Sequence, residues 1–468
     1  MSPNPLRNIP SVNELLESPP LRGLVERISH NAVVSTVRTA LDELRNEMQT
    51  AASERTLPSV SDLAERIAQR IVRHEVPSLR PVINATGILL HTGLGRAPLA
   101  EEAIEDMAAV ARDYASVELD LTSGERSQRK LAVEGLLKEL TGAEAAVVVN
   151  NNAGATMLTL SAVAAGREVI VSRGQLIEIG GSFRLPEVMA ACGAVLREVG
   201  ATNKTWLKDY THAIGEQTGA LLLVHPSNFV VVGFTADVDI AELVRLGRQH
   251  DVPVIHDVGS GAMLDFGQFG FSGEPVVKES IEAGADLVLF SGDKLLGGPQ
   301  CGIVVGRKDL VQRVARHPMA RALRVGKLTL AALAATLRLH RDPEKARRAI
   351  PLLHLLATSA ENLKNRAERL APQMAAAKAV AEAEAVSGVT YLGGGSIPTQ
   401  GLSTWCVALK PSSSSVDRLA AALRTGTPSV VGRVQQDRLW LDLRSVLPRQ
   451  DAQLVAAVEA LDPAKSGP

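Results

Sequence analysis

The tetrapeptide Ser291-Gly292-Asp293-Lys294 is the segment of this chain whose residue types and setting point most directly to chemistry. The segment 286–290, which is apolar after its first residue, precedes it and predicts a buried strand, and a glycine-rich turn follows it at residues 295–302. A lysine at the end of a strand in an α/β sheet is well placed to form a Schiff base with pyridoxal phosphate (PLP). We therefore predict that Lys294 binds PLP and that Ser291 hydrogen-bonds the cofactor phosphate.

PLP also requires an acidic partner for its ring nitrogen. Asp257 closely follows the apolar segment 252–255 and precedes a glycine turn, so it should lie at the end of another strand. A carboxylate in that place can keep the pyridine nitrogen protonated and make the ring an electron sink. We predict this role for Asp257; the alternative is a capping aspartate before the turn.

A phosphate site is the third requirement. In residues 149–156 a strand end runs into small residues and then into an apolar helix. Free backbone N–H groups at a helix N-terminus bind phosphate, and small side chains allow close approach. Asn152, Ala153 and Gly154 are therefore our candidates, although an ordinary strand-to-helix turn would have the same composition.

Three arginines are candidates for binding an anionic substrate. Arg96 ends a glycine-spaced loop, and Arg321 and Arg324 lie close together further along the chain. A guanidinium group in such a place can bind an anion through paired hydrogen bonds. By spacing alone, each of them could instead pair with a surface carboxylate.

The elements that would position these residues follow an alternating pattern of short apolar strands and helices from about residue 82 to 330. This alternation predicts an α/β fold with a mostly parallel sheet, and a ligand site at the carboxyl ends of its strands. The predicted strands cover residues 145–150, 168–172, 194–199, 220–225, 252–257, 286–290 and 302–305.

Smaller regions flank this part of the chain. Residues 1–78 show apolar positions at helical spacing and predict an N-terminal helical domain. Within it, residues 58–61 predict a break, followed by a helix with a loose N-cap at Ser61. Prolines at 77 and 81 predict a linker. After a large domain at 79–330, residues 331–468 predict a smaller α/β domain: helices to about 380, a glycine turn at 393–395, a strand near 405–409, then helix, strand and helix.

Composition narrows the function classes. The chain has 468 residues, 46% of them hydrophobic, which is enough for two or three domains with buried cores. No apolar run approaches the length of a membrane span, and the first residues do not resemble a secretory signal. The formal net charge is -1, so the charge of the whole chain does not attract nucleic acid. We expect a cytoplasmic protein with three free cysteines, and neither a membrane nor DNA as a partner.

Several motifs together resemble those of the bacterial selenocysteine synthases, or L-seryl-tRNA(Sec) selenium transferases, over nearly the whole chain. The segments that carry the resemblance are residues 83–87, 95–99, 150–153, 172–175, 178–184, 227–234, 257–261, 291–298, 321–325 and 432–444.

This resemblance implies a PLP-dependent transferase of fold type I that converts L-seryl-tRNA(Sec) to L-selenocysteinyl-tRNA(Sec). It implies that Lys294 binds PLP, that Asp293 belongs to the same site, and that Arg96, Arg321 and Arg324 hold the phosphate of the donor selenophosphate. The β-hydroxyl of the seryl group would be eliminated to leave an aminoacrylyl group, to which selenium is added. The N-terminal domain would bind the tRNA, and the sites would form at subunit interfaces of a homodecamer.

Two other functions stay open on the sequence. The first is a related PLP-dependent lyase or transferase that acts on a small free amino acid or an amino-sugar acid. Residues 1–78 argue against it, since such an enzyme has no need of them, although their basic and acidic residues nearly balance. The second is a tRNA-binding scaffold without catalysis, which the presence of Lys294 and Asp257 disfavours.

Overall fold

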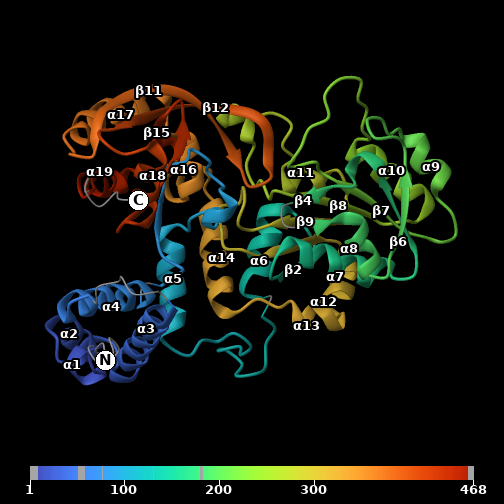
Figure 1. The fold of residues 1–468 in the computed structure, drawn as a ribbon. Coiled ribbons are helices and arrows are strands. Elements are labelled where there is room, and N and C mark those ends of the chain that lie inside the picture. Colours follow the sequence, from blue (N-terminus) through green and yellow to red (C-terminus); the bar gives the residue numbers. More distant parts are fainter. Residues whose placement is uncertain (1–8, 51–57, 76, 130, 180–182, 462–468) are drawn as a thin grey trace. The chain divides into compact units, whose positions relative to one another are not determined.

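The computed structural model describes residues 9–50, 58–75, 77–129, 131–179 and 183–461 (Figure 1). By the contacts among its residues, the chain divides into two compact units, Met1–Pro81 and Val82–Pro468.

The first unit is helical. Apolar residues three and four positions apart, such as Val33, Val37 and Leu41, form its buried core together with Ile67 and Ile71. Its described helices are α1 (Val12–Leu16), α2 (Pro19–Arg27), α3 (His30–Thr50) and α4 (Val60–Glu75).

The start of α4 corrects one prediction. The Asp62 backbone N–H donates to the Ser59 hydroxyl, 3.1 Å away, so Ser59 caps this helix. Ser61 lies inside the helix, and the N-cap predicted there was wrong by two positions.

A seven-stranded sheet forms the centre of the second unit among the described residues. Its order is β2-β10-β9-β8-β7-β3-β6, and all neighbours are parallel except β10, which is antiparallel to both β2 and β9. Each strand coincides with a predicted one to within two residues at either end, so the mostly parallel sheet is confirmed. The strands are β2 (Ala145–Val149), β3 (Glu168–Ser172), β6 (Val195–Val199), β7 (Thr218–Val224), β8 (Val254–Gly259), β9 (Leu287–Ser291) and β10 (Gly302–Gly306).

Helices cover both faces of this sheet, because its strands carry apolar side chains on both sides. One face packs against α7 (Asn152–Ala164), α8 (Leu185–Ala191) and α12 (Lys308–Arg316). The other face packs against α6 (Leu131–Thr141), α9 (Leu207–Ala213), α10 (Ile240–His250), α11 (Val277–Glu282) and α14 (Lys327–His340). Further elements are α5 (Glu101–Arg112), α13 (Pro318–Ala322), α15 (Pro343–Ala349), α16 (Pro351–Ala357), β4 (Glu178–Ile179) and β5 (Phe183–Arg184).

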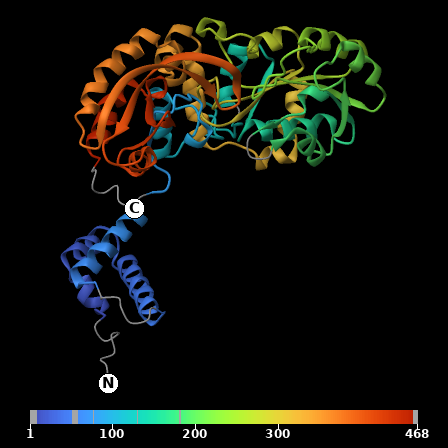
Figure 2. The same ribbon diagram turned by 45° about the horizontal axis from the view of Figure 1, so that its top comes forward.

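A smaller four-stranded antiparallel sheet, β11-β12-β15-β14, lies in the C-terminal part of the second unit. The orange hairpin of β11 and β12 arches along it in Figure 2, and its turn is the predicted one at 393–395. The sequence did not predict β11. The elements here are β11 (Val380–Gly393), β12 (Ser396–Pro411), β14 (Arg433–Gln435), β15 (Arg438–Asp442), α17 (Ala360–Ala375), α18 (Val416–Thr425), α19 (Asp451–Glu459) and the pair β1 (Val82–Asn84) and β13 (Ser429–Val431).

The α/β class, with a helical N-terminal region and a smaller C-terminal α/β part, is thus confirmed. The division into domains at residues 78 and 330 stays a prediction; α14 runs through residue 330. Cys192, Cys301 and Cys406 are free and buried, as expected. Among the described helices, none combines the length and the apolar character that crossing a bilayer demands.

Candidate active site

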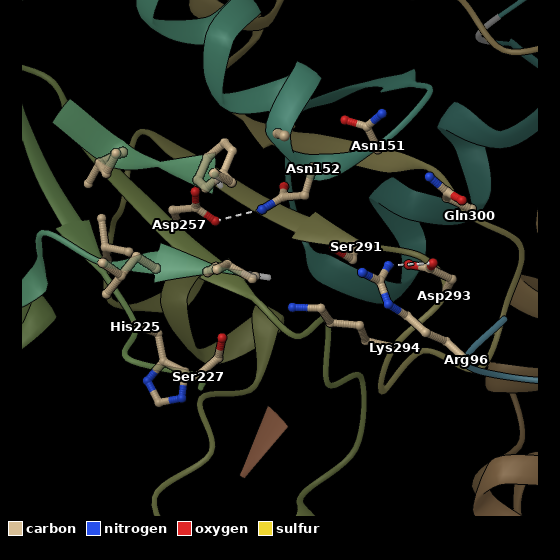
Figure 3. A pocket seen from close by; sticks show the side chains of 17 residues that line it. Arg96, Asn151, Asn152, His225, Ser227, Asp257, Ser291, Asp293, Lys294 and Gln300 are labelled. Atoms are coloured by element: carbon tan, nitrogen blue, oxygen red, sulfur yellow. Dashed lines mark hydrogen bonds and ion pairs between the residues drawn. The ribbon is translucent and has the colours of Figure 1, made fainter. Parts of the chain in front are cut away.

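A cavity of about 280 Å³ lies at the carboxyl ends of β7, β8 and β9, beside the N-terminus of α7 (Figure 3). Most of the residues singled out in the sequence line it, although they are as much as 198 positions apart in the chain, from 96 to 294. The predicted residues that line it are Arg96, Asn152, Ala153, Asp257, Ser291, Asp293 and Lys294.

Backbone hydrogen bonds hold Lys294 in place. The Leu295 N–H donates to the Ser260 carbonyl (2.9 Å), and the Gly292 N–H donates to the Cys301 carbonyl (2.9 Å). Gly261 has φ +75°, and a Cβ there would lie 2.5 Å from the Ser291 carbonyl oxygen. Only glycine therefore lets the loop after β8 pass so close to the end of β9.

The Lys294 amine is buried, and burial lowers its pKa. The positive charge of Arg96 lowers this pKa further, whereas the negative charges of Asp257, Asp293 and Glu274 oppose the change. A lysine with a lowered pKa is neutral in a larger fraction of molecules near pH 7. It can then act as a nucleophile or as a base.

Asp257 is buried at the end of β8, and burial raises its pKa. Asn152 Nδ2 donates to Asp257 Oδ1 (2.8 Å), and Thr156 Oγ1 donates to Oδ2 (2.9 Å). These two hydrogen bonds fix the position of the carboxylate. They also offset part of the rise in its pKa that burial causes. Within the described residues it has no salt-bridge partner, so a cation beside it, such as a protonated ring nitrogen, would be stabilised.

The start of α7 offers donors to a phosphate. Asn152 and Ala153 are the first two residues of the helix, where backbone N–H groups have no intrahelical acceptor. Gly154 differs, because its N–H donates to the Asn151 side chain (2.8 Å) and a Cβ on it would meet Leu323. Gly154 therefore packs against Leu323 rather than lining the cavity. The donors, the buried carboxylate and the lysine together fit PLP.

Arg96 and Asp293 form an ion pair at the cavity, with Nη1 and Oδ2 2.7 Å apart. Arg96 adopts a left-handed backbone conformation (φ 61°) after Gly95 (φ 89°), which turns the loop toward β9. A cation is thus held next to Lys294.

Arg321 and Arg324 lie elsewhere. They are exposed and line a second cavity, of about 750 Å³, together with Arg126, Arg129 and Glu118. Arg324 Nη1 lies 3.7 Å from Glu118 Oε1. The structure of one subunit therefore does not bring these two arginines together with Lys294.

Among the residues in or beside the site that were not predicted, Thr156, His225 and Glu274 make polar contacts there. Thr156 lies one helical turn after Asn152, so its spacing could have indicated it. His225 lines the cavity at the end of β7, and its Nε2 lies 3.4 Å from Oε2 of the buried Glu274. Glu274 lies in a loop between β8 and α11, where no sequence pattern marks it.

The strand order and the buried lysine and aspartate at the strand ends define a fold-type-I PLP-dependent enzyme, which confirms the predicted fold type. The fold is shared with D-glucosaminate-6-phosphate ammonia-lyase, at a TM-score of 0.56 and 21% identity, over 86% of this chain and 98% of that one.

The sequence comparisons name the family. The profile described as L-seryl-tRNA selenium transferase matches residues 82–447, and the selenocysteine synthase N-terminal profile matches residues 6–45. The L-seryl-tRNA(Sec) selenium transferase of Moorella thermoacetica is 48% identical over 100% of this chain and 99% of that protein. That of Carboxydothermus hydrogenoformans is 46% identical over 94% of both. The chain belongs to the L-seryl-tRNA selenium transferase family.

Proposed function

We propose that this chain converts L-seryl-tRNA(Sec) to L-selenocysteinyl-tRNA(Sec), with PLP bound at Lys294 and selenophosphate as the selenium donor. The observation that carries the proposal is the buried Lys294 amine, which shares one cavity with an Asp257 carboxylate fixed by two hydrogen bonds. This site lies in a chain that is similar to selenium transferases along its full length.

PLP, when bound, supplies an electron sink for a carbanion at the seryl α-carbon. Asp257 would hold a proton on the ring nitrogen, and the hydrogen bonds from Asn152 and Thr156 fix its carboxylate. The backbone N–H groups of Asn152 and Ala153 and the Ser291 hydroxyl would hold the cofactor phosphate. Lys294 would hold the cofactor, and because its pKa is lowered, its amine is suited to take up the α-proton of the substrate.

The substrate is an ester, so it lacks the carboxylate that an enzyme acting on free amino acids must bind with an arginine. Arg96 is therefore free to bind the phosphate of selenophosphate beside Lys294, and Asp293 orients it by their ion pair.

Arg321 and Arg324 complete the anion site from a second subunit. In one subunit they line a cavity separate from that of Lys294, so a shared site requires a second copy of the chain. We infer a homodecamer built from dimers, in which the helical unit Met1–Pro81 binds the tRNA. The protein is cytoplasmic, with neither a membrane nor DNA as a partner.

Two measurements test this function. Borohydride reduction of the PLP-bound protein, followed by peptide mass spectrometry, is expected to find the cofactor on Lys294; a protein that takes up no PLP would be a binding scaffold. The PLP-bound protein is then given selenophosphate with either seryl-tRNA(Sec) or free serine. Consumption of the tRNA-bound substrate alone supports the proposal, and consumption of free serine alone would indicate the small-molecule enzyme.

A further inference from the structure

A buried acid–base cluster borders the Lys294 cavity and has no part in the chemistry described above. His225 Nε2 lies 3.4 Å from Glu274 Oε2, and the Ser260 hydroxyl donates a hydrogen bond to Glu274 Oε1. The Glu274 side chain is only 2% exposed, and Ser260 is fully buried. A carboxylate taken this far out of water needs such partners to keep its charge.

The cluster faces the reacting centre. His225 lines the same cavity as Lys294 and Asp257, and the Glu274 charge acts on the Lys294 amine. Figure 3 shows the Lys294 side chain extending between the Arg96 and Asp293 pair on one side and Asp257 and His225 on the other. The His225 side chain is 18% exposed and lines the cavity, so a ligand there can reach it.

Among the described residues, the histidine on the neighbouring strand, His256, has neither a carboxylate partner nor access to the Lys294 cavity. His256 Nδ1 lies 3.0 Å from the Ser280 hydroxyl, and both residues are buried. This pair does not line the Lys294 cavity. Burial also lowers the pKa of His256 to about 3, so it stays neutral and serves packing. His225 differs in having a carboxylate partner and access to the cavity.

The proposed reaction needs a proton that no assigned residue supplies. Hydroxide is a poor leaving group, so breaking the seryl Cβ–O bond is fast only if the oxygen is protonated as it departs. Lys294 is engaged with the α-proton, and Asp293 is engaged in the ion pair with Arg96. Asp257 is held by Asn152 and Thr156. Of the described cavity-lining residues, His225 is the remaining one of a type that commonly serves as a general acid.

We propose that His225 is the general acid for departure of the seryl β-hydroxyl, and that Glu274 is the positioning residue that holds its imidazole at the cavity; this inference rests on the proposed function. The Cβ–O bond breaks, its electron pair leaves with the oxygen, and the oxygen takes the proton of His225 and departs as water. His225 becomes neutral and regains a proton from solvent. Glu274 Oε2, which lies 3.4 Å from His225 Nε2, keeps the imidazole ring in place throughout.

The test compares leaving groups in single turnovers of the PLP-bound protein. Seryl-tRNA(Sec) requires a general acid, whereas β-chloroalanyl-tRNA(Sec) does not, because chloride leaves without a proton. With seryl-tRNA(Sec), His225→Gln is expected to slow elimination about 10²- to 10⁴-fold. With the chloro substrate it is expected to match the unaltered protein. Glu274→Gln should show the same selectivity with a smaller loss, and Ser280→Ala, which removes the contact to His256, is the matched control.

The outcomes are distinct. An equal loss on both substrates, or no loss with seryl-tRNA(Sec), would overturn the role of His225. The visible absorbance of bound PLP shows whether each variant still binds the cofactor. If His225→Gln no longer binds PLP, the comparison of the two leaving groups in Glu274→Gln tests the role of the histidine instead. If the unaltered protein converts no seryl-tRNA(Sec), the proposed function itself fails and the inference falls with it.

Discussion

The cavity around Lys294 and the cavity around Arg321 and Arg324 both gather charged side chains, but they differ in how far that charge is buried. Lys294 and Asp257 are 5% and 7% exposed, whereas the Arg324 side chain is 44% exposed. Burial changes the pKa of both Lys294 and Asp257, so the first cavity can exchange protons. The second keeps permanent, solvated charges, which suit the binding of an anion. The difference in burial suggests that the first cavity is suited to catalysis and the second to binding an anion.

The largest effect that this comparison predicts comes from Asp257. In the proposed role of Asp257, Asp257→Asn removes the negative charge that would hold a proton on the PLP ring nitrogen, and we expect selenium transfer to slow about 10²- to 10³-fold. Single-turnover rates and the visible spectrum of bound PLP measure it. Asp286→Asn is the control, because Asp286 accepts from the Val254 N–H (2.7 Å) just before the start of β9, outside the cavity. Equal losses in both variants would show a structural role.

In the second cavity the expected effect is on binding. If Arg324 binds selenophosphate as proposed, Arg324→Ala removes one charge-assisted contact, and we expect the KM for selenophosphate to rise about 10- to 100-fold with little change in kcat. Because the arginine is exposed, the difference from the unaltered protein should shrink in high salt. A fall in kcat that salt does not affect would place Arg324 in the chemistry instead.

Mixed oligomers sharpen the comparison between the two cavities. Lys294→Ala and Arg324→Ala are each expected to be impaired, but if two subunits build one site, a randomly mixed oligomer regains activity in about a quarter of its sites. Mixing after dissociation, with rates measured at limiting selenophosphate, tests this. Continued lack of activity in a mixture that has assembled would mean that one subunit supplies both residues.

Thr156 predicts a smaller effect within the first cavity. Thr156→Val keeps the shape of the side chain but removes the hydrogen bond to Asp257, and we expect about a 2- to 10-fold loss of activity. Thr156→Ser restores the hydroxyl and should restore the rate. If both variants behave alike, the hydroxyl does not act on Asp257.

The subtlest prediction concerns the titration of Lys294. The Arg96 charge lowers the pKa of the lysine, so Arg96→Ala should raise it. Uptake of PLP by the cofactor-free protein requires the neutral amine, and its pH midpoint should therefore move to higher pH. Arg96→Lys retains a positive charge and should keep the low midpoint. A midpoint that moves down in Arg96→Ala would contradict the charge effect.

The sequence predicted the large sheet and the residues at its strand ends because both depend on local pattern. Lys294 and Asp257 each follow a short apolar run, and parallel strands bring such ends to one edge. Strand β11 was missed because its residues alternate alanine and glutamate near the start, which favour helices, and pairing with β12 overrides that preference.

Contacts between distant segments could not be predicted in the same way. His225 and Glu274 are 49 positions apart, as their numbers show, and meet only because β7 and the loop after β8 converge. The separate location of Arg321 and Arg324 also has no local signal, since their segment is fixed by the Leu323 carbonyl, which accepts from the Asn150 N–H (2.9 Å).

The most direct test of the central claim is the mass of the aminoacyl group after the PLP-bound protein has reacted with seryl-tRNA(Sec) and selenophosphate. The unaltered protein and Lys278→Ala, which changes an exposed lysine paired with Glu282, are expected to yield selenocysteyl-tRNA(Sec). Lys294→Ala is expected to leave the seryl group unchanged. Selenocysteyl product from Lys294→Ala, or unchanged seryl-tRNA(Sec) from the unaltered protein carrying PLP, would contradict the proposed function.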